Sequence, residues 1–314
     1  MSILTKYGTA WGHLPVMGGN VHFVSPSANY TLCGKSYTAS DGNDGTSPES
    51  ALLTPAQAIS NATANAGDVI ALLPGTHSSA SNVAVNKAGL TFIAMHPYSY
   101  LNATLRSNPL ATKVNWTSTL AGTAITVTAA DTTFVGINFI PVTARTAVSF
   151  SGAAARMAVV DCGITLSAAA SVSTKGFVAS AGADSVTFSN LSVLNTIGAQ
   201  GPALDLTGCT NFLLDHPTYL NTTGSWAVGV QFGAASQGMV REGDMACSGT
   251  AITIGYDGTG VAANKSIIFL NNRFGVSPGA GAIKNFTAAF AELVNNWFAT
   301  VGGGAGFVIV TVVA

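Results

Sequence analysis

The 314 residues predict an all-β fold: a right-handed, single-stranded parallel β-helix with a short N-terminal capping helix. The first observation behind this prediction is a short strand pattern, apolar at every second residue, that recurs from residue 124 onward. The pattern begins at residues 124, 147, 176, 203, 227, 251 and 282, at spacings of 23, 29, 27, 24, 24 and 31 residues. Repetition at this period is typical of a solenoid.

A second and longer strand pattern follows each of the first, from "TFVGINF" (133 to 139) to "AELVNNWF" (291 to 298). The connections are five to eight residues of Gly, Ala, Ser, Thr and Asn, which leaves no room for crossover helices. Seven such units predict a coil whose turns pair in parallel about 4.8 Å apart, with weaker upstream strands at "VIALL" (from residue 69) and at 83–95. An antiparallel sandwich is the alternative, but its tight-hairpin signals occur only at 41–45 and at Asp257 and Gly258.

An Asn-rich corner recurs inside the second pattern, at Asn190, Asn271 and Asn295. A bend between two sheets needs a residue that tolerates left-handed backbone geometry, and Asn does so. We therefore expect these residues to be structural corners that stack on one another. A row of polar active-site residues is the alternative interpretation.

Residues 41–77, "DGNDGTSPESALLTPAQAISNATANAGDVIALLPGTH", predict the start of the coil. Thr54 is a good N-cap and Pro55 suits the first helical position, so a capping helix is expected near 54–65. Gly67 and Asp68 then turn the chain into its first strand, which Pro74 and Gly75 close.

Two acids in the same segment, Asp41 and Asp44, are candidate metal ligands. An EF-hand loop starting at Asp41 would need acidic or amide residues and a glycine where Gly45, Thr46 and Leu52 stand. Both acids are therefore interpreted as turn-formers, with a structural calcium ion as the alternative.

The segment 41–77 resembles the N-terminal cap and first turn of the pectate-lyase-like β-helix superfamily, including its bacteriophage virion branch of spikes, decoration proteins and tailspikes. The resemblance implies a right-handed parallel β-helix. For function it implies either a polysaccharide lyase or glycosidase, or a virion protein, because enzymes and non-enzymes of the superfamily share this cap.

Charge is scarce in the chain, with 12 Lys plus Arg and 13 Asp plus Glu, or 8% of residues. A nucleic-acid partner needs a basic excess, so the net charge of −1 argues against one. We expect no cofactor and no membrane span. The four cysteines (Cys33, Cys162, Cys209 and Cys247) are expected to be small buried side chains rather than disulfides or metal ligands.

One cluster of charged residues offers candidate catalytic groups on matching corners of adjacent turns: Asp215, His216, Arg241, Glu242 and Asp244. A glycosidase needs two facing carboxylates. The alternative is a solvated ion-pair patch, because a guanidinium stands among the acids. We favour the ion-pair patch, and we therefore expect none of these five residues to be catalytic.

These observations divide the chain into an extended N-terminal attachment segment (1–40), the β-helix (41–300) and a C-terminal strand (301–314). The resemblance and the low charge predict a bacteriophage virion structural protein without catalysis, a trimeric capsid decoration or head spike. Its partners would be other copies, the major capsid or other virion proteins, and host surface glycan, and its location the capsid or tail surface. The alternatives are a polysaccharide depolymerase and a glycan-binding adhesin of the tail-fibre or tailspike type.

Overall fold

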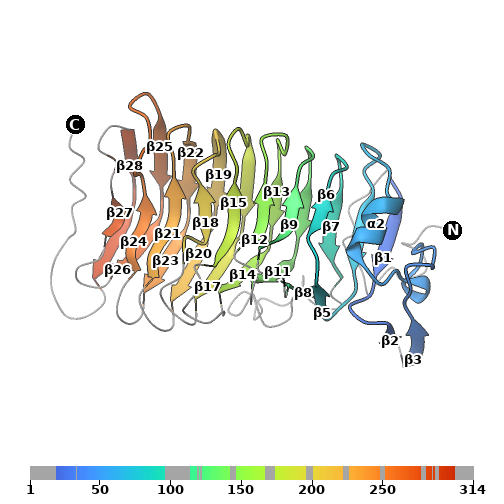
Figure 1. Ribbon diagram of the computed structural model, residues 1–314. Helices are drawn as coiled ribbons and strands as arrows, with labels where there is room; N and C mark the ends of the chain where they lie inside the picture. Colours follow the sequence, from blue (N-terminus) through green and yellow to red (C-terminus); the bar gives the residue numbers. More distant parts are fainter. Residues whose placement is uncertain are drawn as a thin grey trace.

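The computed structural model describes residues 19–32, 34–95, 114–118, 120, 122–141, 146–166, 174–195, 201–221, 226–247, 252–276, 281–284, 286 and 290–300. They form a parallel β-solenoid, with strands stacked along one axis from the N-terminal end to the C-terminal end (Figure 1). The predicted all-β parallel coil is thus confirmed. Residues 1–18 and 301–314, which hold 18 residues of the expected attachment segment (1–40) and all of the expected C-terminal strand, lie outside the described residues.

Three parallel sheets of ten, nine and eight strands make up the coil. Sheet 1 contains β1 (Val21–Val24), β4 (Val69–Leu72), β7 (Thr91–Ala94), β10 (Thr133–Val135), β13 (Ala158–Val160), β16 (Val186–Ser189), β19 (Asn211–Asp215), β22 (Gln237–Arg241), β25 (Ser266–Leu270) and β28 (Phe290–Val294). Sheet 2 contains β5 (Thr76–Ser79), β8 (Val114–Ser118), β11 (Ile137–Ile140), β14 (Gly163–Leu166), β17 (Ser192–Asn195), β20 (Thr218–Asn221), β23 (Asp244–Cys247), β26 (Arg273–Val276) and β29 (Trp297–Thr300). Sheet 3 contains β6 (Val83–Val85), β9 (Thr123–Val127), β12 (Thr146–Phe150), β15 (Lys175–Ala179), β18 (Leu204–Leu206), β21 (Trp226–Phe232), β24 (Ile252–Asp257) and β27 (Gly281–Lys284).

Each of the seven sequence repeats supplies one strand to every sheet, so a repeat contains three strands and not two. The longer sequence pattern is split by a sharp bend: in the first repeat, Gly136 lies between β10 and β11 with φ 73°. Buried apolar side chains lie on both sides of the bend, Phe134 before it and Ile137 and Phe139 after it, which is why the two strands read as one pattern in the sequence.

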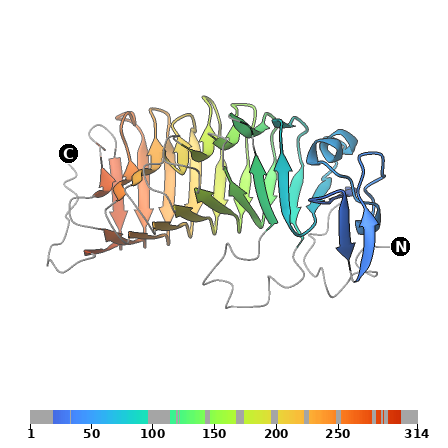
Figure 2. The same ribbon diagram turned by 60° about the horizontal axis from the view of Figure 1, so that its bottom comes forward.

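The N-terminal end contains elements that the sequence pattern did not reveal. We expected the first strand at residue 69, but β1 precedes it in sheet 1 and pairs with β4 in parallel. Next comes an antiparallel hairpin of β2 (Asn29–Leu32) and β3 (Lys35–Thr38), a separate two-stranded sheet at the N-terminal end of the coil (Figure 2).

The helical segment lies where the sequence placed it, although it is shorter. A 3-10 turn η1 (Pro48–Ser50) precedes α2 (Pro55–Asn61), which ends before residue 65 because Ala62 is already extended. The Thr54 side chain accepts the backbone N–H of Gln57, as an N-cap does. Buried side chains of α2 face the coil, and the helix contacts β1, β4 and β6.

The turn between α2 and β4 is held by a fully buried carboxylate. Gly67 has φ 73°, and Asp68, with 0% of its surface exposed, accepts the backbone N–H groups of Asn20 and Thr63. This carboxylate therefore ties the segment before β1 to the segment after α2. After β4, Pro74 leads to Gly75, whose φ of 133° favours glycine at the turn into β5.

The interior of the coil is filled by side chains that stack from turn to turn. A run of phenylalanines along the axis, with ring centroids 5.1 to 5.7 Å apart, consists of Phe92, Phe134, Phe139, Phe177 and Phe188. Of the four cysteines, Cys162 and Cys209 are buried thiols, as expected, and Cys33 and the Cys247 side chain lie outside the described part of the chain. Burial raises the pKa of the Cys209 thiol to about 12. Within the described residues, no helix is long and apolar enough to span a bilayer.

Candidate functional site

The bend between sheet 1 and sheet 2 has the same backbone geometry in seven successive repeats. Its first residue has a φ between 52° and 73°, in the left-handed region that most side chains avoid. We call these residues the corner column: Gly136, Asp161, Asn190, His216, Glu242, Asn271 and Asn295. The geometry expected at Asn190, Asn271 and Asn295 is therefore present, and four corners without asparagine share it.

Backbone hydrogen bonds explain why the geometry repeats. In the first six of the seven corners, the N–H of the corner residue donates to the carbonyl that ends the sheet 1 strand of the following repeat, as Asn190 does to Asp215 and His216 does to Arg241, at 2.8 and 2.9 Å. The left-handed residue turns its N–H along the coil axis. Each of these six corners is thus held by the next one, whichever side chain it carries.

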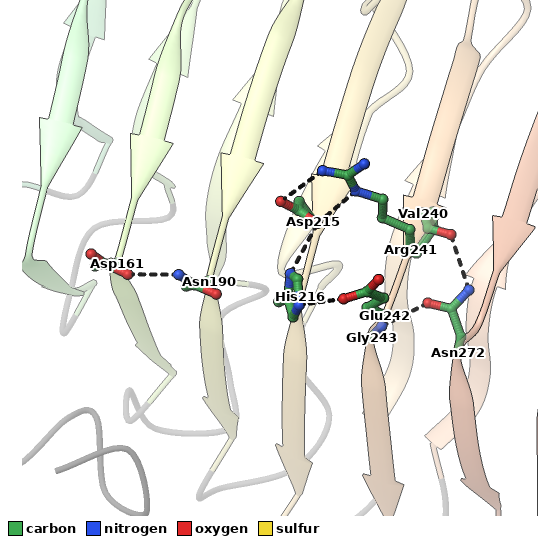
Figure 3. A network of polar contacts seen from close by, with 9 residues as sticks. All are labelled: Asp161, Asn190, Asp215, His216, Val240, Arg241, Glu242, Gly243 and Asn272. Atoms are coloured by element: carbon green, nitrogen blue, oxygen red, sulfur yellow. Dashed lines mark hydrogen bonds and ion pairs between the residues drawn. The ribbon is translucent and has the colours of Figure 1, made fainter. Parts of the chain in front are cut away.

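The candidate catalytic residues lie on two neighbouring corners, as their matching positions in the sequence predicted. His216 and Glu242 belong to the corner column, while Asp215 and Arg241 end the strands β19 and β22 (Figure 3). The His216 ring lies between two carboxylates, with Nδ1 2.9 Å from Asp215 Oδ1 and Nε2 2.5 Å from Glu242 Oε2. Arg241 donates to both oxygens of Asp215, at 2.7 and 3.2 Å.

These contacts engage every charged group of the four-residue cluster. The hydrogen bonds from Arg241, more than its charge or that of His216, lower the pKa of the Asp215 carboxyl, although partial burial opposes the shift. The same pairing raises the pKa of the Arg241 guanidinium. A substrate would have to displace an ion pair to reach either ring nitrogen of His216.

Asp244, the fifth candidate, does not join the cluster. It is the exposed first residue of β23, and its register neighbours are Thr218 on β20 and Arg273 on β26. No hydrogen bond or ion pair links it to the other four candidates in the part of the chain that the structure describes. The structure therefore brings four of the five predicted residues together.

The two acids weighed as metal ligands are used in turns. Asp41 accepts the backbone N–H groups of Leu53 and Thr54 and the Thr54 hydroxyl, at 2.8 to 3.0 Å. Asp44 accepts the Ser50 hydroxyl and the Thr46 N–H, and these hydrogen bonds lower the pKa of its carboxyl. Among the described residues no group of three or more His, Cys, Asp or Glu side chains is arranged to hold a metal ion.

A pair of amides behind the corner column has a role that the sequence pattern only hinted at. Asn272 is fully buried; its Oδ1 accepts the Gly243 N–H and its Nδ2 donates to the Val240 carbonyl, both in the preceding repeat (Figure 3). Asn296 repeats part of this arrangement, because its side chain accepts from Asn272 and donates to Phe269. The doublets "NN" at 271–272 and 295–296 are the sequence signal. The first Asn of each doublet bends the chain, and the side chain of the second forms hydrogen bonds with backbone groups at the bend of the preceding repeat.

Substitution of Glu242 tests whether this position is constrained by its left-handed backbone or by the charge of its side chain. Glu242→Asn and Glu242→Val both remove the carboxylate, but Asn tolerates left-handed geometry and a β-branched residue does not. We expect the Val variant to unfold with a free energy about 1 to 2 kcal/mol lower than the Asn variant, measured by urea denaturation. Equal stabilities would show that the left-handed corner at Glu242 is not a constraint on the fold.

Comparison with family models finds no match, and comparison with curated proteins finds none. Among solved structures, a pectin methylesterase from Aspergillus niger superposes with a TM-score of 0.52 at 13% identity, over 94% of this chain and 93% of that one. A rhamnogalacturonan lyase gives 0.49 at 12% identity over 88% and 87%, and Geobacillus virus E2 ORF18 gives 0.32 at 12% over 78% and 57%. The first of these confirms, for the fold alone, the resemblance found in residues 41–77; the other two superpositions are too loose to bear on function.

Proposed function

We propose that this chain is a non-catalytic structural protein of a bacteriophage virion: a homo-oligomeric β-solenoid, expected to be a trimer, mounted as a capsid decoration or head spike. The observation that carries the non-catalytic assignment is the placement of His216 and Glu242 in the corner column. The backbone demands a left-handed residue there in every one of the seven repeats. The left-handed geometry at these two residues is therefore a property of every corner and not a feature of the charged cluster.

The ion pairs of the four-residue cluster also support a non-catalytic role. Of the three acids that an enzyme could use, Asp215, Glu242 and Asp244, two lie within ion-pair distance of a basic group, Asp215 with Arg241 and Glu242 with His216. A general acid needs a raised pKa to hold its proton near neutrality, but the pKa of Asp215 is lowered. The virion assignment rests on the resemblance of residues 41–77 to the virion branch of the superfamily and on the low charge of the chain.

Two structural details belong to this proposal. The coil winds right-handed, as nearly all parallel strand crossovers do. The helix α2 closes its N-terminal end, since its apolar side packs on β1, β4 and β6 and would shield the first strands from water. The attachment role of residues 1–40 and the pairing role of 301–314 are likewise part of the proposal.

A polysaccharide-acting enzyme is the second candidate. One observation favours it: the structure places an imidazole, a guanidinium and two carboxylates together on an exposed corner, on a fold shared with a pectin methylesterase. A glycan-binding adhesin would use the side of the coil without turnover.

Incubation of the purified chain with bacterial capsular polysaccharide separates these functions. We expect no release of reducing ends and no unsaturated product, and gold-labelled antibody should place the chain on the surface of intact phage particles. Turnover that Glu242→Gln abolishes, while Glu292→Gln on the exposed side of β28 leaves it intact, would overturn the proposal in favour of the enzyme. A particle without the chain would overturn the virion role.

A further inference from the structure

A row of outward-facing residues crosses sheet 2 near the C-terminal end of the coil. Thr218, Asp244, Arg273 and Trp297 are the first residues of β20, β23, β26 and β29, and each lies in register with the next. The residues that follow three of them, Tyr219, Met245 and Phe274, are at most 2% exposed. Because side chains alternate along a strand, the row points away from the core. We call these four residues the outer row.

Trp297 is the most unusual member of the outer row, because 76% of its surface is exposed. No other large hydrophobic side chain of the described residues is exposed to this degree. An indole left in water forgoes the burial of a large apolar surface. Trp and Arg are also the residues most enriched among those that dominate binding energy at protein interfaces, and here Trp297 lies next to Arg273.

The two charges of the outer row differ from three pairs of opposite charges elsewhere in the coil. Across neighbouring turns, Arg156 pairs with Asp131, Lys175 with Asp205 and Arg241 with Asp215. Asp244 and Arg273 are opposite in sign, exposed and on adjacent strands, yet neither side chain forms a hydrogen bond or ion pair with any residue that the structure describes. A carboxylate, a guanidinium and an indole are thus presented to the outside in one line.

We propose that the outer row is a two-fold contact between two copies of this chain. A two-fold axis that lies in the contact plane, parallel to the strands of sheet 2 and between β23 and β26, would place Asp244 opposite Arg273 of the second copy and Arg273 opposite its Asp244. The same operation lays Trp297 over Thr218 of the second copy. The row is self-complementary in charge under this operation, which a contact between identical surfaces requires. The inference rests on the proposed homo-oligomer and adds a contact that joins copies in pairs, which the three-fold contacts of a trimer do not supply.

Single charge reversals, followed by the double reversal that should restore the contact, test this proposal. The measurement is the mass of the full chain in solution, determined by light scattering after size exclusion. Asp244→Arg and Arg273→Asp should each halve the mass of the assembly, and the double variant should restore it. Trp297→Ala should raise the dissociation constant at least about 30-fold. Glu292→Arg, on exposed Glu292 of β28, is the matched control and should leave the mass unchanged. Since all of these side chains are exposed, far-ultraviolet circular dichroism should show every variant folded.

Different failures have different meanings. If the parent chain is a monomer, the proposed homo-oligomer and this contact both fail. If the parent is an oligomer whose mass survives both reversals and Trp297→Ala, or if the double variant does not recover, only the contact is wrong. If Trp297→Ala keeps the mass but abolishes binding of an acidic oligosaccharide, the row is a saccharide site and the inference is also wrong.

Discussion

Replacement of Phe177 by alanine should lower the free energy of unfolding by about 3 to 5 kcal/mol. The Phe177 ring is fully buried and lies between Phe139 and Phe188, with centroids 5.2 and 5.3 Å away and edge-to-face geometry on both sides. Its removal opens a cavity inside three consecutive turns, and the parallel strands around it are held in register and cannot close the gap. Urea denaturation followed by circular dichroism measures the loss.

Phe177→Leu is the control for this experiment. Leucine keeps most of the buried volume, so the loss should stay below about 1.5 kcal/mol. If the alanine variant loses no more than the leucine variant, the interior collapses around the missing ring. The stacked aromatic interior would then be loosely packed.

Acidification from pH 6.5 to pH 4 should remove about 3 kcal/mol of stability through His77 alone. The His77 ring is buried on β5, its Nε2 lies 2.9 Å from the Leu73 carbonyl, and burial lowers the pKa of the imidazole to about 4, from 6.5. The unfolded chain therefore binds a proton in this range and the folded chain does not. The contribution of His77 to the unfolding free energy is complete above pH 6.5, declines as the pH falls, and is fully lost below about pH 4.

His77→Gln isolates this contribution from that of the carboxylates, which also titrate in acid. Glutamine has an N–H donor for the Leu73 carbonyl but cannot take up a proton in this range. The unfolding free energy of the parent minus that of the variant, measured at pH 7, 5.5 and 4, should fall by about 3 kcal/mol between pH 7 and pH 4. A difference that does not change with pH would show that the pKa of His77 is the same in the folded and the unfolded chain.

The coil itself could be predicted because its cause is local and repeated. Alternating apolar residues, glycine-rich turns and the N-cap at Thr54 each act within a few residues, so the sequence alone carries them. β1 could not be found in this way. It is four residues long and its partner β4 begins 48 residues after it, so no repeat spacing marks it.

The corner column shows a different limit. The bend is defined by φ, and Gly136, Asp161, His216 and Glu242 meet the same backbone demand with unrelated side chains. Only the asparagine corners carry a signal in the sequence, and their geometry was predicted correctly. The grouping of Asp215, His216, Arg241 and Glu242 was also predicted, because matching positions of a repeat stack. The outer row escaped prediction because it depends on the exact register of four strands.

The corner column also determines where this protein can change its length. From β13 onward, two residues separate each sheet 1 strand from its sheet 2 strand, whereas the other connections vary in length from repeat to repeat. An inserted residue at this corner would break the hydrogen bond to the next turn and turn the following side chains to the opposite face. Insertions, peptide tags and grafted epitopes therefore belong in the connections that enter and leave sheet 3, and those edges of the coil are where related sequences are free to diversify.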